Sequence, residues 1–322
     1  MPSYDGDVEF RGPVGLPSNL ERAIPRYRSS SHPFAGRVGA NQAFTVEART
    51  SEDEEILERE PDATPHMPFR ELMDLRPITN INLWKAALIE GVGSLLLIYI
   101  TTWASLSPAD IPAQLGSPNN GVFVPPLIGG ITSFIFLSLF ISAFGPVSGA
   151  HFNPLISFAT FCARLCSLPR LILYLSAQIG GSALAGLLIR ASYGSRDFKV
   201  GGCWLSRDEI LTREAFVIEL VSTTILLFLA FGLGLDPRQA QVVGPTLAPF
   251  LVGLSFGTLA FATAYTRYGY GGPSFNPARC MGAFVGSRFP KWHWIHWVAD
   301  GLACIIHGIC YFFVPPWVKE RE

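Results

Sequence analysis

Two short segments of the chain carry the residues best suited to chemistry, and each contains the dipeptide Asn-Pro. They are residues 148–155, SGAHFNPL, and residues 271–280, GGPSFNPARC. Asparagine is a strong helix N-cap, and proline suits the first helical turn because its missing N–H would have no partner there. Each segment therefore predicts the start of a helix at Pro154 or Pro277. The chemistry expected there is hydrogen-bond donation from Asn153 and Asn276 beside a positive helix end.

The stretches that follow, from Leu155 and from Ala278, are apolar for roughly ten residues, which is too short to span a bilayer. Such a stretch fits a half-helix that enters and leaves by the same membrane face. Irregular backbone at membrane depth is tolerated only where it is buried in protein or lines an aqueous path. The two segments are therefore predicted to line a pore, with both Asn amides donating to a passing water or hydroxyl group while the helix dipoles repel cations and protons.

Arg279, the third residue after Asn276, adds a positive charge at this depth. An arginine there could merely satisfy loop carbonyls, but a charge inside a membrane is costly and indicates function by default. We therefore expect Arg279 to line the pore as an ion filter.

The elements that would position these residues are membrane-spanning helices. The chain has 322 residues, is 49% hydrophobic and 15% charged, and concentrates its charges outside several long apolar windows. A bilayer requires roughly 20 apolar residues per helix. Six windows meet this requirement, at residues 83–104, 122–143, 171–191, 215–235, 243–265 and 292–314.

The six spans form an inverted repeat. Residues 89–94, IEGVGS, resemble residues 218–223, IELVST, and Pro126 and Pro249 precede the two motif asparagines at the same spacing. Three spans per repeat make the halves cross the membrane in opposite directions. The predicted fold is an all-α membrane protein of six helices and two half-helices. Its parts are a disordered tail (1–80), a channel domain (81–316, with repeats at about 81–191 and 214–316) and a short C-terminus (317–322).

The distribution of basic residues predicts that both termini are cytoplasmic, because Arg70, Arg76 and Lys85 precede the first span and the loop after it has no Lys or Arg. The net charge of −1 gives no basic footprint for nucleic acid. Six cysteines without a CxxC pair indicate neither a disulfide scaffold nor a metal site. We expect no cofactor and no metal.

The two motifs resemble the signature loops of the aquaporins, and the resemblance covers about residues 81–316. Cys280 after the second motif and residues 201–203, GGC, also resemble the X intrinsic proteins of fungi and plants. Leu155 stands where the family usually has Ala, a change that bears on solute preference more than on channel identity. The resemblance implies a homotetramer with one pore per subunit, in a lipid bilayer that is expected to be the plasma membrane.

The resemblance also assigns the pore constriction to Ser133, Ala260, Pro273 and Arg279. Ala264 is the alternative to Ala260, because counting forward from Pro249 selects Ala260 whereas counting back from Asn276 selects Ala264. Water-selective members carry bulky Phe and His at these positions, so this filter is expected to be wider and less polar. Glycerol, hydrogen peroxide, urea or boric acid should then compete with water as cargo.

Several titratable residues have more than one interpretation. Glu90 and Glu219 are buried carboxylates of the kind found in proton relays, but the resemblance implies that they accept hydrogen bonds from loop N–H groups, and it places His151 with them as loop support. Cys203 and Cys280 are predicted to form a bridge or to allow closure of the pore by oxidants. For Asp300 the sequence gives no single role, and we expect it either to pair with His293, His296 or His307 or to face the headgroups.

Other functional classes remain as alternatives. Inverted repeats with broken helices also describe ion-coupled transporters, but these need a charged binding site at the repeat interface. A membrane enzyme would need a recognisable triad or metal spacing, which His151, Cys280 and Asp300 do not form. A structural or signalling protein with a closed pore would be told apart only by a flux assay. The sequence favours a passive channel.

Overall fold

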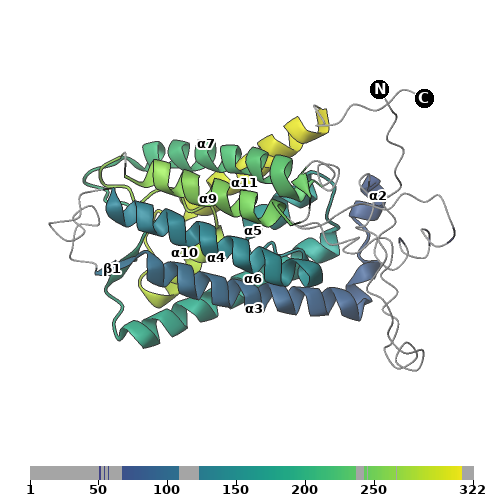
Figure 1. Ribbon diagram of the computed structural model, residues 1–322, viewed down its shortest axis with the longest axis horizontal. Coiled ribbons are helices and arrows are strands. Elements are labelled where there is room, and N and C mark those ends of the chain that lie inside the picture. The colour runs from purple at the N-terminus through teal and green to yellow at the C-terminus, as the bar shows by residue number, and fades with distance from the viewer. Residues whose placement is uncertain are drawn as a thin grey trace, which may run out of the picture.

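A computed structural model describes residues 67–108, 123–236, 243–244, 246–265 and 267–313, together with positions 51, 54 and 57. Its long helices run side by side in one elongated bundle, with α2 near one end and β1 at the other (Figure 1). They are α3 (Ile81–Ala104), α4 (Val124–Ser148), α6 (Leu168–Tyr193), α7 (Thr212–Ala230) continued by the π-helical turn η3 (Phe231–Leu235), α9 (Ala248–Ala264) and α11 (Trp294–Phe313).

These helices match the predicted spans in order, although their ends differ by a few residues, and α4 and α6 are longer than predicted. Five of them are long and apolar enough to cross a membrane, counting α7 with η3 as one. The fifth span is shorter than predicted: α9 has 17 residues and begins at Ala248 rather than at Val243. Gly244, with a φ of 76°, interrupts the helix before Pro249 in its first turn.

The two predicted half-helices are α5 (Pro154–Cys162) and α10 (Pro277–Gly286). Each begins at the proline of its motif. The side chain of Asn153 accepts a hydrogen bond from the N–H of Leu155 at 3.0 Å, and that of Asn276 accepts one from the N–H of Arg279 at 3.1 Å. The local sequence thus caps both helices as expected.

The two halves of the repeat are interlocked. Within the halves, α3 packs on α6 and α7 packs on α11, while α4 and α9 pack on each other between the halves. Each half-helix also packs on a helix of the other half, α5 on α11 and α10 on α6. The two Asn-Pro motifs therefore meet inside the bundle, where both halves fix their positions.

Glycines allow the closest helix contacts. A Cβ atom added to Gly181 on α6 would lie 2.1 Å from the carbonyl oxygen of Gly91 on α3, and one added to Gly257 on α9 would lie 2.4 Å from that of Gly130 on α4. Real side chains do not tolerate such distances. Small residues at these crossings bring the backbones together, as is common between membrane helices.

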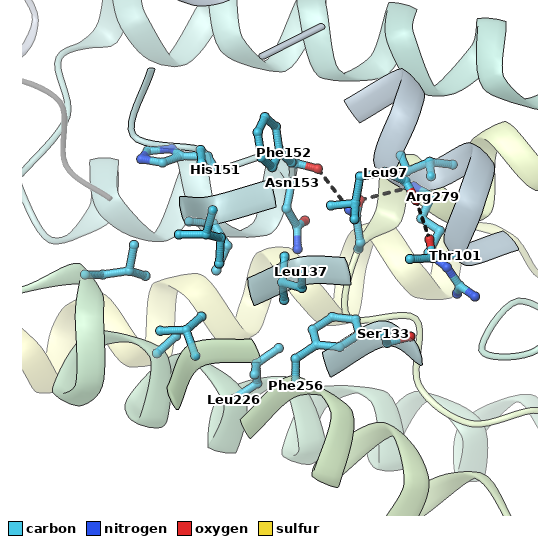
Figure 2. A pocket seen from close by; sticks show the side chains of 18 residues that line it. Leu97, Thr101, Ser133, Leu137, His151, Phe152, Asn153, Leu226, Phe256 and Arg279 are labelled. Atoms are coloured by element: carbon cyan, nitrogen blue, oxygen red, sulfur yellow. Dashed lines mark hydrogen bonds between the residues drawn. The ribbon is translucent and has the colours of Figure 1, made fainter. Parts of the chain in front are cut away.

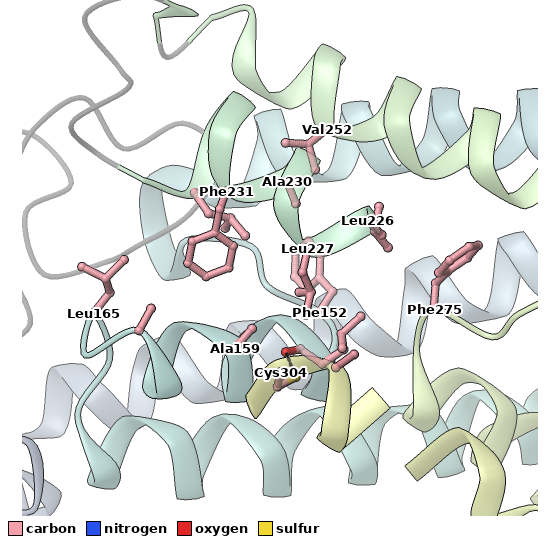
Figure 3. Close-up of a cluster of buried hydrophobic side chains, with 14 of the residues drawn as sticks. Phe152, Ala159, Leu165, Leu226, Leu227, Ala230, Phe231, Val252, Phe275 and Cys304 are labelled. Atoms are coloured by element: carbon pink, nitrogen blue, oxygen red, sulfur yellow. Dashed lines mark hydrogen bonds between the residues drawn. The ribbon is translucent and has the colours of Figure 1, made fainter. Parts of the chain in front are cut away.

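The apolar core surrounds the first half-helix. Figure 3 shows Ala159 of α5 beside Leu227 and Phe231 of α7 and η3, with Cys304 of α11 below them. In contrast, large apolar side chains cover the outside of the bundle. On α4 the exposed residues Ile128, Ile131, Ile135 and Leu139 follow helical spacing. A face of this kind suits hydrocarbon rather than water.

The segment just before the first span is folded, which corrects the predicted disordered tail in part. Residues 67–80 contain α2 (Phe69–Leu72) and the 3-10 turn η2 (Arg76–Thr79). Met67 and Leu72 are only 1% and 4% exposed, and Ile78 packs against the cluster around Tyr174. Burial of these apolar side chains orders a stretch whose composition looks tail-like. Apart from positions 51, 54 and 57, the earlier tail lies outside the described residues, as do residues 317–322.

At the end of the bundle opposite α2, loop segments form a small cover. The strands β1 (Leu106–Pro108) and β2 (Phe198–Val200) pair antiparallel. The chain after β2 then runs beside the second motif, with an isolated bridge between Leu205 and Tyr270. We call this side of the molecule the vestibule face.

Candidate pore and its constriction

The two Asn-Pro loops contact each other directly through their asparagine amides. Asn153 Nδ2 donates to the carbonyl oxygen of Phe275 at 2.6 Å, and Asn276 Nδ2 donates to that of Phe152 at 3.1 Å. The sequence alone suggested that both amides were free to serve the pore. Each amide nitrogen carries two hydrogens, so one is used to join the loops and a second remains on each Asn for a solute. Both side chains line the central cavity.

The residue before each asparagine has a strained backbone. Phe152 and Phe275 have φ values of 50° and 52°, in the left-handed region that bulky side chains rarely adopt. Such residues cost about 1–3 kcal/mol each and persist only where the surroundings hold them. The same strain at equivalent positions shows that the inverted repeat extends to backbone geometry.

Glu90 holds the first loop in this conformation. Its Oε1 accepts hydrogen bonds from Ser148 Oγ at 2.6 Å and from the N–H of His151 at 3.0 Å. Its Oε2 accepts from the N–H of Phe152 at 2.6 Å and from Gln178 Nε2 at 2.9 Å. Four donors around one fully buried carboxyl group fit a carboxylate that supports the loop rather than one that relays protons.

Glu219 holds the second loop in a similar way. Its Oε1 accepts from the N–H of Ser274 at 2.8 Å and, through a shorter bond, from the Ser274 hydroxyl. Tyr270 donates to Oε2 at 2.8 Å, and His296 Nδ1 lies 3.3 Å from Oε1. Tyr270 lies outside the spanning helices, and burial raises the pKa of its phenol well above the usual value, so it remains a donor.

His151 lies on the pore side of the first loop. Its Nδ1 is 3.0 Å from Ser157 Oγ, and the ring lines the central cavity. The predicted supporting role is thus combined with a place on the pore wall. Leu155, in contrast, packs into the core around α5, and its carbonyl oxygen lies 3.3 Å from Cys304 Sγ. The replacement of Ala by Leu at this position therefore acts on packing.

Arg279 is anchored on the side away from the pore. Its Nη2 donates to the carbonyl oxygen of Gly201 at 2.7 Å and to Ser105 Oγ at 3.0 Å, and its Nη1 lies 3.3 Å from Cys203 Sγ. A guanidinium group has five N–H donors. Among the described residues these contacts account for three, which leaves two for a solute.

Two cavities follow one another along the pore and share three lining residues. The central cavity, about 60 Å³, is lined by both Asn side chains and by apolar residues such as Leu97 and Leu137. The vestibule cavity is about 330 Å³. Ser133, Phe256 and Arg279 line both, and they define the constriction between the two cavities. Figure 2 shows Ser133 and Phe256 on one side of the central cavity and Arg279 on the other.

The constriction contains two of the four predicted filter residues and adds Phe256. Ser133 and Arg279 lie there, but Ala260, Ala264 and Pro273 line the vestibule cavity. Both alanines lie on that wall, so the choice between them is of little consequence. Phe256 was not predicted from the sequence, although it lies one helical turn before Ala260 and so on the same face of α9. Trp204, which lines the vestibule next to Gly271, was not predicted either.

Cys203 and Cys280 are joined in a disulfide bond. It links the segment after β2 to the first turn of α10, next to Arg279. Backbone hydrogen bonds reinforce the link, from the N–H of Gly202 to the carbonyl of Gly271 at 2.6 Å and from the N–H of Gly271 to the carbonyl of Trp204 at 3.0 Å. The segment after β2 and the second motif are therefore held together as one structural unit. The other four cysteines are not part of a disulfide bond, and of these Cys166 and Cys304 are buried.

The predicted partners of Asp300 are wrong. The side chain is 1% exposed, so it does not face the headgroups. It accepts a hydrogen bond from Thr223 Oγ1 at 2.9 Å and lies 3.3 Å from Ser274 Oγ, while His296 contacts Glu219 instead. Helical spacing puts these histidines on nearly the same side as Asp300, but their rings have other partners. His293 Nδ1 lies 2.9 Å from the carbonyl oxygen of Pro290, and His307 packs against Phe228 and Phe231. Within the described part of the chain, no three His, Cys, Asp or Glu residues could hold a metal ion.

Comparisons with known proteins agree with this geometry. The sequence profile of the major intrinsic protein family matches residues 77–311. Aquaporin-B of Dictyostelium discoideum is 30% identical over 74% of this chain and 87% of its own length. Aquaporin-4 of Rattus norvegicus is 26% identical, over 72% and 67%. The crystal structure of the aquaglyceroporin from Plasmodium falciparum has the same fold, with a TM-score of 0.55, 18% identity, and coverage of 72% of this chain and 96% of that one.

Proposed function

The chain belongs to the major intrinsic protein family, and from this premise we propose that its pore conducts glycerol, hydrogen peroxide, urea or boric acid in addition to water. Members of this family are channels and not enzymes. The protein is therefore an integral membrane channel through which water or small solutes pass passively. Which solutes pass depends on the constriction.

The composition of the constriction carries the proposal. It combines one hydroxyl group (Ser133), one aromatic ring (Phe256) and one guanidinium group (Arg279). The oxygens of a small polyol can accept hydrogen bonds from Arg279, and its hydroxyl groups can donate to or accept from the Ser133 hydroxyl. Its carbon backbone can pass along the Phe256 ring. A solute with both kinds of surface replaces its hydration most completely there, which lowers its barrier.

The vestibule supports the same solutes. Ala260, Ala264 and Pro273 leave a cavity of about 330 Å³ in front of the constriction. This is near the lower end of the roughly 300–1,000 Å³ typical of pockets for small molecules. A polyol can enter this space before it loses most of its water.

Exclusion of ions follows from the positive charges at the constriction and at the point where the two loops meet. Arg279 contributes a full positive charge, and the N-termini of α5 and α10 contribute partial positive charges where the two loops meet. The second amide hydrogens of Asn153 and Asn276 orient a water molecule as an acceptor and so interrupt a chain of proton-conducting waters. We infer that both cations and protons are excluded.

The proposal is tested by stopped-flow light scattering on purified full-length protein in liposomes. Osmotic water exit and glycerol entry are compared with those of empty liposomes. Glycerol entry well above the background, with measurable water flux, is the expected result. Fast water flux with glycerol entry at the background level would contradict the proposed solutes but not the channel itself.

Assembly and location belong to the proposal as well. We infer a homotetramer with one pore per subunit, with both termini on the cytoplasmic side of the plasma membrane. The apolar exposed face of α4 supports burial against lipid or a neighbouring subunit. Placement among the X intrinsic proteins rests on Cys280 and on the GGC segment at residues 201–203.

A further inference from the structure

Asp300 is a buried acid that the pore mechanism does not use. It lies on α11 at 1% exposure, between Thr223 of α7 and Ser274 of the second loop. A buried carboxyl group in a membrane is costly unless it is fully hydrogen-bonded or neutral. Its role must therefore be sought in its contacts.

The contacts of Ser274 determine where the hydrogens lie. Its hydroxyl oxygen makes a short hydrogen bond to Glu219 Oε1 and lies 3.3 Å from Asp300 Oδ2. A serine hydroxyl has a single hydrogen to donate but can accept through its lone pairs. The short bond uses that hydrogen on Glu219. The contact with Asp300 is then a hydrogen bond only if Asp300 carries a proton and donates it towards Ser274.

Glu219, in contrast, has no place for a proton. Both of its oxygens already accept, Oε2 from Tyr270 at 2.8 Å and Oε1 from the N–H and the hydroxyl of Ser274. His296 Nδ1 also approaches Oε1 at 3.3 Å. A single proton shared by the two acids therefore belongs on Asp300. This arrangement avoids placing two negatively charged carboxylates beside the same Ser274 hydroxyl group.

Within the part of the chain that the structure describes, the other ionisable groups around Asp300 do not offer it a counter-charge. The Arg279 guanidinium on α10 is directed to Gly201 and Ser105. On α11 the His307 ring stacks against Phe228 and Phe231. The ionisable groups that interact with Asp300 are Glu219 on α7, Cys304 on α11 and Tyr270 of the second loop. His296 on α11 contacts Glu219 instead.

The first half of the repeat shows what kind of group this position needs. Gln178 on α6 follows Asn153 at nearly the same spacing at which Asp300 on α11 follows Asn276, and α6 packs on α3 as α11 packs on α7. Gln178 Nε2 donates to Glu90 Oε2 and to Ser157 Oγ, both at 2.9 Å. The first loop thus has a permanent donor beside its carboxylate. An aspartic acid can do the same only in its protonated form.

We propose that Asp300 is a positioning residue of the second pore loop that works as a protonated carboxylic acid, donating a hydrogen bond to Ser274 and closing the chain Asp300–Ser274–Glu219. Ionisation of Asp300 breaks this bond and places a second negative charge beside Glu219. Ser274 lies just before Phe275 and Asn276 in the second loop. Loss of its hydrogen bond to Asp300 therefore loosens this loop at the constriction. Conductance is highest while the proton is present and falls as the pH rises. The flux part of this inference rests on the proposed channel function, whereas the protonation part does not.

Infrared spectroscopy of the purified full-length protein tests the protonation directly. The wild type is expected to show the C=O band of a protonated, non-exchanging carboxylic acid at neutral pH, and this band should be lost in Asp300→Asn. Asp236→Asn is the matched control, because Asp236 is equally buried but accepts a hydrogen bond from Tyr311. That variant should retain the band. The proposal is overturned if Asp300→Asn leaves the carboxylic acid band unchanged, whatever the flux measurements give.

Glycerol or water flux against pH then tests the positioning role. Asp300→Asn supplies a permanent donor, so it should keep the wild-type flux at low pH and lose the decline at high pH. Asp300→Leu fills the same space without a donor and should lower the flux at every pH. If the Leu variant does not fold, the comparison of the wild type with Asn remains decisive: identical pH profiles of these two proteins would reject a positioning role for the proton.

Discussion

Phe256 lies at the constriction, where the vestibule and the central cavity meet. Its ring approaches that of Phe275 edge-on, with centroids 5.4 Å apart and an interplanar angle of 61°. This contact joins the pore wall on α9 to the strained residue before Asn276. One side chain thereby sets the width of the constriction and supports the second loop.

Truncation of this ring should widen the pore. For Phe256→Ala we expect glycerol entry into liposomes to rise several-fold relative to water exit, since the aromatic face is removed while Ser133 and Arg279 remain. The ring is half-buried, so the loss of stability should fall below the roughly 3–5 kcal/mol typical of a fully buried Phe→Ala change. The ratio of the two permeabilities is the measurement.

The matched control for this experiment is Phe250→Ala on the same helix. Phe250 is 47% exposed and packs edge-on against Phe134 on the outer surface of the bundle. Its truncation should leave the ratio unchanged. An unchanged ratio in Phe256→Ala as well would mean that the ring does not limit solute passage.

Replacement of Arg279 should increase the leakage of ions through the pore, beyond any effect on stability. A unit charge about 4 Å away contributes roughly 4 kcal/mol at an effective dielectric constant of 20. Even partial loss of this barrier in Arg279→Ala is expected to raise cation or proton leakage about tenfold or more. Fluorescent pH indicators inside liposomes measure the leak. Arg288→Ala is the control, because Arg288 forms only an exposed ion pair with Asp197.

At the scale of elements, each half-helix depends on a buried carboxylate on a neighbouring span. The Glu90 side chain accepts hydrogen bonds from the N–H groups of His151 and Phe152. The loop conformation leaves these two groups without helical partners. Hydrogen bonds to a charged acceptor contribute about 1.5–3 kcal/mol each. The carboxylate thus offsets the backbone strain at Phe152.

Replacement of this acceptor should destabilise the whole protein. In Glu90→Gln one oxygen becomes an NH₂ group that faces donors, and we expect a loss of about 2–5 kcal/mol. Thermal unfolding in detergent, followed by circular dichroism, measures the effect. Glu214→Gln on α7 is the control: this residue forms an exposed ion pair with Arg267, and its loss should cost under about 1 kcal/mol. Equal unfolding temperatures for the two variants would contradict the supporting role of Glu90.

The disulfide links two elements that are far apart in the sequence. Cys203 and Cys280 are separated by 77 residues, and closing a loop of this length stabilises a protein by up to about 4 kcal/mol in the chain-entropy treatment. Reductant should therefore lower the unfolding temperature of the wild type and have no effect on a Cys203→Ser, Cys280→Ser double variant. Thiol titration after unfolding should find four thiols without reductant and six with it. Six thiols without reductant would exclude the bond.

On the scale of the whole molecule, the apolar outer surface predicts assembly within the bilayer. Light scattering combined with size-exclusion chromatography in detergent should give the mass of a tetramer. If each subunit has its own pore, vesicles with mixtures of wild type and Arg279→Ala should leak in proportion to the variant. A monomeric mass with full flux per chain would show that one bundle suffices.

The length of the apolar windows was enough to find six helices, because a bilayer demands a narrow range of helix lengths and leaves few alternatives. The duplicated motifs were enough to find the repeat and the two half-helices. The Asn-Pro pairs located both helix starts, since capping is a local property of the sequence. Family resemblance placed Ser133 and Arg279 at the pore. The prediction of a disordered tail was wrong from Met67 onwards, because the order of this stretch comes from burial against other segments.

Short-range patterns in the sequence were thus sufficient to predict the membrane fold, the inverted repeat and the two donors at its centre. The three-dimensional packing was needed to show that Phe256 lies at the constriction, that each Asn also joins the opposite loop, and that Asp300 meets Ser274 rather than a histidine of its own helix. These features depend on which helix faces lie opposite each other, within a few ångströms, across segments distant in the chain. Helical periodicity gives the face of a residue but not the partner that packs against it.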